Sequence, residues 1–233
     1  MEAVVMAAGA GTRLRPLTER WPKPILPIDG RPVLATLLRD LAAAGIRAVW
    51  LVTGHLAEQV EALAGDGAAF GLEVRSVRQP GVLGSADAVQ RAVTAGAKTP
   101  FLVSAADTLF GRGEISSFAS VFASQSAAAG ALAIRTDPPP GKGRNAIRSV
   151  DGRVVALRDD DPANPWSGAP LWGIRDPVAE RLCLDRAPFE LENAFQAAID
   201  AGETVMSVEI GKTRDLTYPL DLVKENFPYL RAT

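Results

Sequence analysis

Apolar and polar positions alternate in blocks over residues 1–105, and the blocks predict strands and helices in turn. Strands are expected at residues 3–8, 48–53, 73–77 and 101–104, and helices at 33–44, 56–64 and 84–95. The first helix carries apolar side chains at helical spacing (Val33, Leu34, Leu37, Leu38 and Leu41), and Gly45 is its expected C-cap. Strands separated by helices favour a parallel sheet with right-handed crossovers. Because ligands bind at the carboxyl ends of such strands, the loops after the first, third and fourth strands are expected to face one cleft.

The alternation is less regular after residue 105. Helices are expected at 114–124, 190–201 and 219–230, and strands at 130–134, 169–174 and 205–210. Two further strands, 146–150 and 153–157, flank Asp151-Gly152, a pair typical of a hairpin turn. No internal repeat or low-complexity linker divides the chain, so a single domain, 1–233, is predicted.

Charge and cysteine content exclude several classes of partner. The 233 residues carry a formal net charge of −2, so neither a nucleic-acid surface nor a polybasic membrane patch is expected. No apolar run approaches the ~20 residues of a membrane helix, and no signal peptide is recognised. With one cysteine, Cys183, an internal disulfide is excluded and the cytosol is predicted. With one cysteine and one histidine, His55, metal sites built from Cys and His are excluded, and any metal is expected on oxygen ligands, as for Mg²⁺. His55 itself is interpreted as a loop residue at a strand end, with a general base as the alternative.

A turn of small residues follows the first expected strand. Gly9 and Gly11 let the backbone turn sharply, and free N–H groups in such a turn suit a phosphate. Arg13 can fork onto phosphate oxygens, and Lys23 is held between two prolines as a second fixed charge. The pattern indicates a cradle for a nucleoside triphosphate. A strand that ends in a glycine turn, with solvated Arg and Lys side chains, is the plainer alternative.

Two aspartates follow expected strands and are candidates for a metal site. Asp107 comes after the strand at 101–104, and Asp215 after the strand at 205–210. Two carboxylates at one phosphate site repel each other unless a cation such as Mg²⁺ lies between them. The alternative for each is an aspartate that begins a turn or caps a helix.

Several segments of the chain resemble one family. The string A-A-G-A-G-T-R-L-R-P-L-T at residues 7–18, followed by Pro-Lys-Pro at 22–24, resembles the signature of sugar-phosphate nucleotidylyltransferases, also called NDP-sugar pyrophosphorylases. Residues 102–110 resemble that family's strand ending in G-D-x-x-F, with Ala in place of Gly. Residues 213–222 resemble its closing W-x-D-x-G-T-P-x-D-L, with Thr in place of Trp and Thr-Tyr in place of Gly-Thr. The resemblance implies that Asp107 and Asp215 hold Mg²⁺.

The segment 79–88 resembles the family's Q-x-x-x-x-G-T-A-x-A. The resemblance implies that Gln79 and Gly84 read the edge of the base. An amide and a peptide backbone both offer a donor and an acceptor, which match the imide face of uracil or thymine. The alternatives are a surface polar residue for Gln79 and a glycine at a helix start for Gly84.

The acceptor side matches the family less well. Trp172-Gly173-Ile174 resembles its T-G-I/L strand, and Glu190 stands at the start of a segment similar to its E-L-T-D-A-L-Q helix, which implies that Trp172, Gly173 and Glu190 bind the acceptor. The family's E-K-P, whose Lys holds the sugar phosphate, is replaced by Arg-Asp-Asp-Asp at 158–161. Either Lys142, Arg144 or Arg158 supplies the missing charge, or the acceptor differs from a hexose 1-phosphate.

The resemblance implies a Rossmann-like three-layer α/β fold, glycosyltransferase-A-like, with a mixed, mostly parallel central sheet. Residues 1–105 would form the nucleotide-binding half, and 106–233 the acceptor-binding half with a metal-closing C-terminal segment. No hexapeptide repeat follows residue 210, so a form without the left-handed β-helix domain is expected. Nucleotide contacts are expected from Ala8, Gly9, Gly11, Thr12, Arg13, Gln79, Gly84 and Ser85, with Arg13 and Lys23 as the catalytic residues.

The implied activity joins a nucleoside monophosphate from a triphosphate to a phosphorylated acceptor, of the sugar 1-phosphate type, and releases pyrophosphate. UTP or dTTP is favoured, and a cytidylyl- or guanylyltransferase is the alternative within this class. A nucleotide-binding sensor that has lost acceptor chemistry and a regulatory subunit of a larger assembly stay open. Homo-oligomerisation also stays open.

Overall fold

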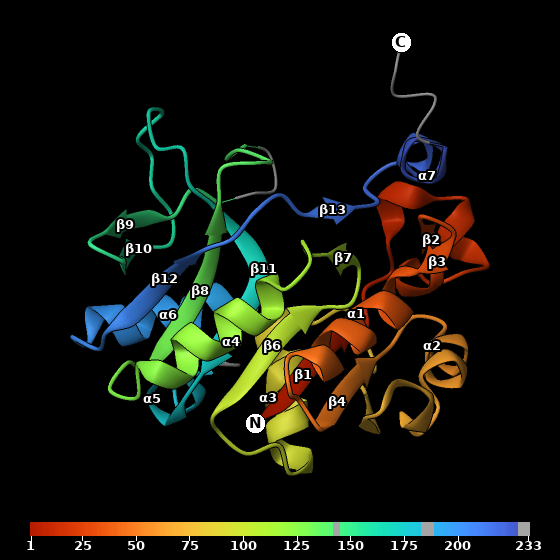
Figure 1. Ribbon diagram of the computed structural model, residues 1–233, viewed down its shortest axis with the longest axis horizontal. Helices are drawn as coiled ribbons and strands as arrows, with labels where there is room; N and C mark the ends of the chain where they lie inside the picture. Colours follow the sequence, from red (N-terminus) through yellow and green to blue (C-terminus); the bar gives the residue numbers. More distant parts are fainter. Residues whose placement is uncertain (142–144, 183–188, 228–233) are drawn as a thin grey trace.

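The computed structural model describes residues 1–141, 145–182 and 189–227. The strands of the main sheet are β1 (Glu2–Ala7), β4 (Ala48–Thr53), β5 (Glu73–Arg78), β6 (Phe101–Ala105), β8 (Gly130–Arg135), β9 (Arg148–Val150), β10 (Arg153–Ala156), β11 (Ser167–Ile174) and β12 (Val205–Glu209). Within the described ranges they form one nine-stranded sheet in the order β5-β4-β1-β6-β11-β8-β12-β10-β9 (Figure 1).

The predicted parallel sheet is confirmed for the first half of the chain. Strand β1 pairs in parallel with β4 and β6, and β4 pairs in parallel with β5. Beyond β6 the sheet is mixed: β11 runs antiparallel to β6 and β8, while β12 runs parallel to β8. The hairpin predicted around Asp151-Gly152 is present as β9 and β10. The carboxyl ends of β1, β5 and β6 therefore lie at one edge of the sheet.

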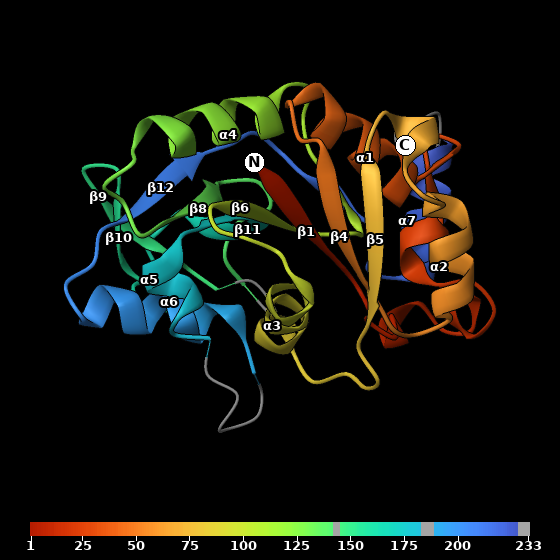
Figure 2. The ribbon, with the colours of Figure 1, turned by 90° about the horizontal axis from the view of Figure 1, so that it is seen from below.

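Helices cover both faces of this sheet, which gives three layers (Figure 2). One apolar core joins the sheet to α1 (Val33–Ala43), α2 (Ala57–Ala64) and α4 (Glu114–Ser124). A second core on the other face contains α3 (Ser85–Ala95), α5 (Asp176–Ala179) and α6 (Leu191–Asp200). The predicted helices are thus present, and the short α5 was not predicted. No helix in the described part of the chain has the length and apolar character needed to cross a membrane.

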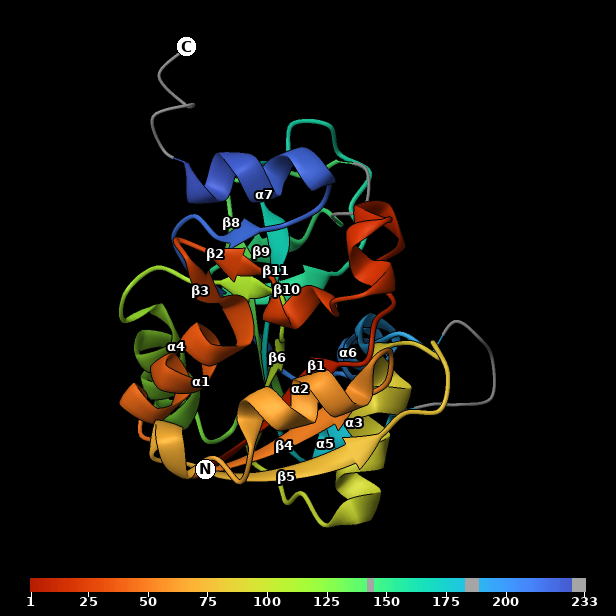
Figure 3. The same cartoon turned by 90° about the vertical axis from the view of Figure 1, so that its right-hand side faces the viewer.

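An early segment of the chain, residues 14–33, meets the late segment 216–226 beside the glycine-rich loop. A small hairpin of β2 (Pro27–Ile28) and β3 (Arg31–Pro32) lies under α7 (Pro219–Asn226) (Figure 3). A third apolar core holds this region together, and Leu14, Leu26 and Leu216 are among its buried members. Helix α7 was predicted over 219–230, and residues 228–230 lie outside the described residues.

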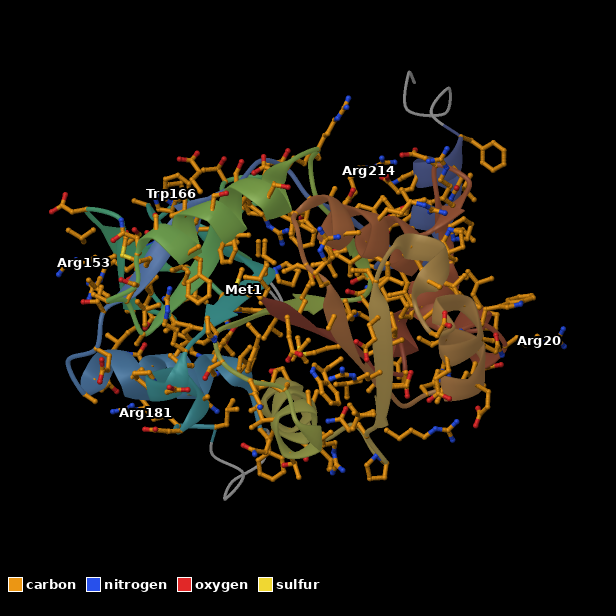
Figure 4. The ribbon with its side chains drawn as sticks, turned by 60° about the horizontal axis from the view of Figure 1, so that its bottom comes forward. Met1, Arg20, Arg153, Trp166, Arg181 and Arg214 are labelled. Carbon is orange, nitrogen blue, oxygen red and sulfur yellow. The ribbon has the colours of Figure 1, made fainter. Side chains whose placement is uncertain are left out.

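A second pair of short strands brings distant segments together. Strands β7 (Thr108–Leu109) and β13 (Arg214–Asp215) are antiparallel, with Asp215 opposite Thr108. Arg214 clamps this closing segment, because it binds Asp29 and Glu225 at 2.5 Å each (Figure 4). Neither strand has an apolar run of its own, so the sequence pattern did not predict them. Their pairing sets Asp215 next to the residue that follows Asp107.

Candidate functional site

The glycine-rich loop after β1 is braced from within. Gly11 adopts φ +59°, and a Cβ there would lie 2.9 Å from Thr18 Cγ2, so only glycine fits without a shift. The Thr18 hydroxyl donates to the Gly11 carbonyl at 2.9 Å, and His55 Nε2 donates to the Thr18 carbonyl at 2.6 Å. The His55 backbone N–H also donates to the carbonyl of Ala8, which is buried, at 3.2 Å. The histidine therefore braces the loop.

A cavity of about 470 Å³, the loop cavity, opens against this loop. It is lined by Met6, Ala7, Gly9, Ala10, Gly11, Thr12, Arg13, Leu14, Lys23, Pro24, Val82, Asp107, Leu216 and Thr217. Gly9 to Arg13 follow β1, Val82 follows β5 and Asp107 follows β6. The prediction that the loops after the first, third and fourth strands face one cleft is confirmed.

Lys23 and Asp107 meet at the floor of the loop cavity. The Lys23 Nζ lies 2.6 Å from Asp107 Oδ2, and the two side chains are 16% and 31% exposed. Lys23 begins a short 3₁₀ helix, Lys23–Ile25, and the flanking prolines fix its backbone. The ammonium is thus held where it can meet an anion that enters the cavity.

A second cavity of about 700 Å³, the sheet cavity, extends over β8 and β11. It is lined by Arg13, Lys23, Asp107, Thr108, Leu132, Arg135, Asn145, Ile147, Leu157, Gly168, Ala169, Pro170, Trp172, Glu192, Asp215, Thr217, Tyr218, Asp221 and Glu225. It shares Arg13, Lys23, Asp107 and Thr217 with the loop cavity. The two cavities therefore meet at a cluster that carries two cations and a carboxylate.

Asp215 faces the same space as Asp107, because both line the sheet cavity. The Thr217 hydroxyl donates to Asp215 Oδ1 at 3.0 Å, and the Thr217 and Tyr218 N–H groups donate to Asp221 Oδ2 at 3.0 and 2.8 Å. Among the described residues no group of three or more His, Cys, Asp or Glu side chains forms a metal cage. A donor set of two carboxylates, completed by substrate phosphates, is the type of site that Mg²⁺ uses.

Gln79, the first residue of segment 79–88, is buried in a hydrogen-bond network. Its Nε2 donates to the Gly84 carbonyl at 3.1 Å and to Asp87 Oδ2 at 2.7 Å, and Arg91 Nε also donates to Asp87 Oδ2 at 2.7 Å. Burial would raise the pKa of Asp87, but the hydrogen bonds from Arg91 and Gln79 outweigh it and lower that pKa. Both amide hydrogens of Gln79 are thus used inside the protein. Gln79 and Gly84 do not line the loop cavity, whereas Val82 does.

Segment 79–88 is joined to the start of α6. Gly84 has φ +106°, and a Cβ there would lie 2.4 Å from the Phe189 carbonyl oxygen. The Ala86 N–H donates to that oxygen at 2.7 Å. The Ser85 hydroxyl donates to Glu190 Oε2 at 2.6 Å and accepts the Leu191 N–H at 2.7 Å. Ser85 and Glu190, predicted to bind nucleotide and acceptor, are thus bound to each other, and neither lines the two cavities.

The predicted acceptor residues on β11 face opposite ways. Trp172 lines the sheet cavity. A Cβ on Gly173 would lie 2.7 Å from the Phe122 ring, so Gly173 is packed against α4 on the other face. Of the three cations suggested as replacements for the family Lys, Arg158 is 65% exposed and lies 3.8 Å from Glu192. Lys142 and Arg144 lie outside the described residues.

Two cavity residues were missed by the sequence reasoning. Glu192, on α6, accepts a hydrogen bond from Asn145. Burial raises the pKa of Glu192, and the bond from Asn145 and the charge of Arg158 offset this only in part. Arg135 ends β8, and its position after the apolar run 130–134 was a usable signal, as it was for Asp107. No such signal marks Glu192 within its helix.

The comparisons with known proteins show the family and the fold of the chain. Residues 2–143 match the family model described as nucleotidyl transferase. The chain is 34% identical to the glucose-1-phosphate thymidylyltransferase of Streptomyces antibioticus, over 97% of the chain and 65% of the relative. It is 30% identical to the mannose-1-phosphate guanylyltransferase of Mycobacterium tuberculosis, over 100% of the chain and 65% of the relative. The inositol-1-phosphate CTP transferase of T. maritima has the same fold, with a TM-score of 0.78, 20% identity, and coverage of 97% and 96%. The chain spans about two thirds of the length of these curated relatives.

Proposed function

Because the chain belongs to the nucleotidyl transferase family, we propose that it transfers a nucleoside monophosphate from a triphosphate to a phosphorylated acceptor and releases pyrophosphate. The observation that carries this function is the junction of two cavities. Arg13, Lys23 and Asp107 line both the loop cavity and the sheet cavity. A triphosphate in the first and an acceptor in the second would meet at these residues, which is the arrangement that a transfer between two bound substrates requires.

The reaction needs no protein nucleophile, because an acceptor phosphate is already an anion. One of its oxygens attacks the α-phosphorus in line, a new P–O bond forms, and the bond to the β-phosphate oxygen breaks. Arg13 and the amides of residues 9–12 hold the departing β- and γ-phosphates. Lys23, at the junction, contacts the α-phosphate and the acceptor phosphate. The rate gain then comes from positioning and from charge neutralisation.

Magnesium dependence is part of the proposal. Asp107 and Asp215 both line the sheet cavity and offer the hard oxygen ligands that Mg²⁺ prefers. When bound there, the ion would neutralise charge on the phosphates. Thr217 orients Asp215 through its hydroxyl, 3.0 Å away. Lys23 lies 2.6 Å from Asp107 and keeps that carboxylate compensated in the ion's absence.

A sugar 1-phosphate acceptor and UTP or dTTP are proposed as the substrates. The relatives carry sugar 1-phosphate names, which supports the acceptor class. They differ in the base they are named for, so the base rests on Gln79, whose Oε1 suits the imide N–H of uracil or thymine. A guanylyltransferase is the second candidate, favoured by the Mycobacterium tuberculosis relative. A cytosolic location is proposed as well, since the chain has a single cysteine.

The function is tested by a pyrophosphate-release screen of five triphosphates against a panel of sugar 1-phosphates and other phosphorylated acceptors with Mg²⁺. Turnover with one pair is expected. A protein that binds a triphosphate yet turns over no pair would overturn the proposal and favour a nucleotide sensor.

The metal assignment is tested by Asp107→Asn. This variant is expected to lose Mg²⁺-dependent turnover while its circular dichroism and melting temperature stay near those of the wild type. The control is Asp151→Asn, which removes the same charge from the exposed β9–β10 turn. Wild-type rates in Asp107→Asn would contradict the role given to this carboxylate.

A further inference from the structure

The two cavities differ in their positive charges. Among the described residues, the cations that line the sheet cavity are Arg13, Lys23 and Arg135. Arg13 and Lys23 also line the loop cavity, where the triphosphate is proposed to bind, whereas Arg135 does not. Among the described cations of the two cavities, Arg135 is therefore the one that lines the sheet cavity and not the loop cavity.

Arg135 is fixed to a rigid part of the fold. It ends β8, pairs with Ser167 of β11, and is 4% exposed. Its Nη1 donates to the Thr213 hydroxyl, and its carbonyl accepts from the Ser167 hydroxyl at 3.4 Å. A guanidinium held in this way loses little conformational freedom when a ligand binds. Its planar fork of N–H donors suits the oxygens of a phosphate.

Carboxylates also line the sheet cavity, so a further cation there favours the binding of an anionic acceptor. The carboxylates that line it are those of Asp107, Glu192, Asp215, Asp221 and Glu225. A phosphate that enters meets this negative charge in a partly desolvated space, where like charges repel more strongly than in water. Lys23 already lies 2.6 Å from one of these carboxylates.

The exposed Arg158 is a weaker candidate for this task. Arg158 does not line the sheet cavity. It lines a separate hollow formed by the loops around residues 139–141 and 158–165. Its side chain is 65% exposed, so water screens its charge. Arg135 is buried, lines the sheet cavity and is held by the Thr213 hydroxyl.

We infer that Arg135 binds the phosphate of the acceptor, and that the Thr213 hydroxyl orients its guanidinium for this contact. The inference rests on the proposed function, because it takes the sheet cavity as the acceptor side. It names a residue that sets specificity for an anionic acceptor over a neutral one. Arg135 and Lys23 would hold the acceptor phosphate from two sides, with the attacking oxygen toward the junction of the cavities.

The kinetic test compares Arg135→Gln and Arg135→Lys with the wild type, using the best substrate pair from the screen. Arg135→Gln is expected to raise the KM for the acceptor by about 10- to 100-fold, the loss typical of a hydrogen bond to a charged group. The KM for the triphosphate is expected to change less than about 2-fold. Arg135→Lys keeps the charge but loses the fork, so an intermediate KM is expected. Equal changes in both KM values, or an unchanged acceptor KM, would overturn the inference.

The control is Arg153→Gln, which removes the same charge from an exposed position on β10. Arg153 lies at the end of the molecule away from Arg214 (Figure 4). It is expected to match the wild type in both KM values. Thr213→Val serves if Arg135→Gln fails to fold, because it removes the orienting hydroxyl and leaves the charge. A raised acceptor KM supports the inference, and an acceptor KM equal to that of the wild type refutes it.

A binding measurement separates this inference from the proposed function. Glucose 1-phosphate, inositol 1-phosphate and inorganic phosphate are titrated by NMR into wild type and Arg135→Lys, with glucose as the uncharged probe. Phosphate-dependent binding that weakens in Arg135→Lys supports the inference even where the wild type turns over no pair, in which case the proposed function alone fails. Equal binding by both proteins, or no binding of any phosphate probe by the wild type, sinks it.

Discussion

The Ser85 hydroxyl joins the segment that follows β5 to the start of α6, and its removal tests what this serine does. It donates to Glu190 Oε2 at 2.6 Å and accepts the Leu191 N–H at 2.7 Å. Ser85→Ala removes both bonds. The Leu191 N–H is one of the N-terminal amides of α6 that have no partner inside the helix, so it loses its capping group.

The expected loss follows from these two bonds. A hydrogen bond to a charged group contributes about 1.5–3 kcal/mol and one between neutral groups about 0.5–1.5 kcal/mol. Ser85 and Glu190 are only half-buried, so water replaces part of what is lost. We expect the free energy of unfolding to fall by about 2 kcal/mol, and the melting temperature by roughly 4–8 °C in a chain of this size.

Urea unfolding followed by circular dichroism measures this loss. Ser85→Thr keeps the hydroxyl and is expected to lose much less, and Ser120→Ala, an exposed serine of α4, serves as the matched control. A loss below about 0.5 kcal/mol, within the usual range of surface substitutions, would refute the structural role. If the KM for the triphosphate rose at the same time, Ser85 would act on the nucleotide instead.

Three further changes test the packing and the charge around the cavities. Gly84→Ala is expected to lower the free energy of unfolding by more than about 2 kcal/mol in urea titration, because the new Cβ would meet the Phe189 carbonyl at 2.4 Å with φ at +106°. Gly173→Ala is expected to cost about 1–3 kcal/mol by overpacking the Phe122 ring, 2.7 Å from the new Cβ, while the KM for the acceptor is kept. An acceptor KM that rose with unchanged stability would return Gly173 to the binding site. Burial raises the pKa of Glu192 above its ordinary value of 4.5, so the ionised side chain lowers the free energy of unfolding. As the pH falls through the raised pKa to 4.5, the side chain is protonated and the wild type is expected to become more stable relative to Glu192→Gln. Urea midpoints of both proteins between pH 7.5 and 4.5 measure the difference, and a constant difference would contradict the shift.

The sequence predicted the parallel half of the fold well, since β1, β4 and β6 are apolar runs and helices separate the strands along the chain. The pairs β2–β3 and β7–β13 were missed for a physical reason. They are two residues long and are held by the third core and by the Arg214 clamp rather than by apolar patterns of their own. Contacts between residues far apart in the chain decide them, and local periodicity does not report such contacts.

The candidate site divides in the same way. The loop residues Gly9–Arg13 and the carboxylate of Asp107 follow strand ends, and they line the cavities as a strand-end argument predicts. Some residues assigned from motif spacing, such as Ser85, Gly173 and Glu190, do not line either cavity. Spacing along the chain does not tell which way a side chain points, so Gly173 was placed on the acceptor side although it packs against α4. Arg135 was overlooked because it matched no motif.

The hydrogen bond between Ser85 and Glu190 joins one segment that lines the loop cavity to another that lines the sheet cavity. Segment 79–85 contributes Val82 to the loop cavity, and the helix that begins beside Glu190 contributes Glu192 to the sheet cavity. The Phe189 carbonyl is bound by Ala86, so two backbone segments are joined as well as two side chains. A base that shifts segment 79–85 would therefore move the start of α6, and with it a carboxylate that faces the acceptor. If the proposed function holds, the choice of base and the choice of acceptor would be coupled through this contact, because a closely packed interface transmits a small displacement instead of absorbing it.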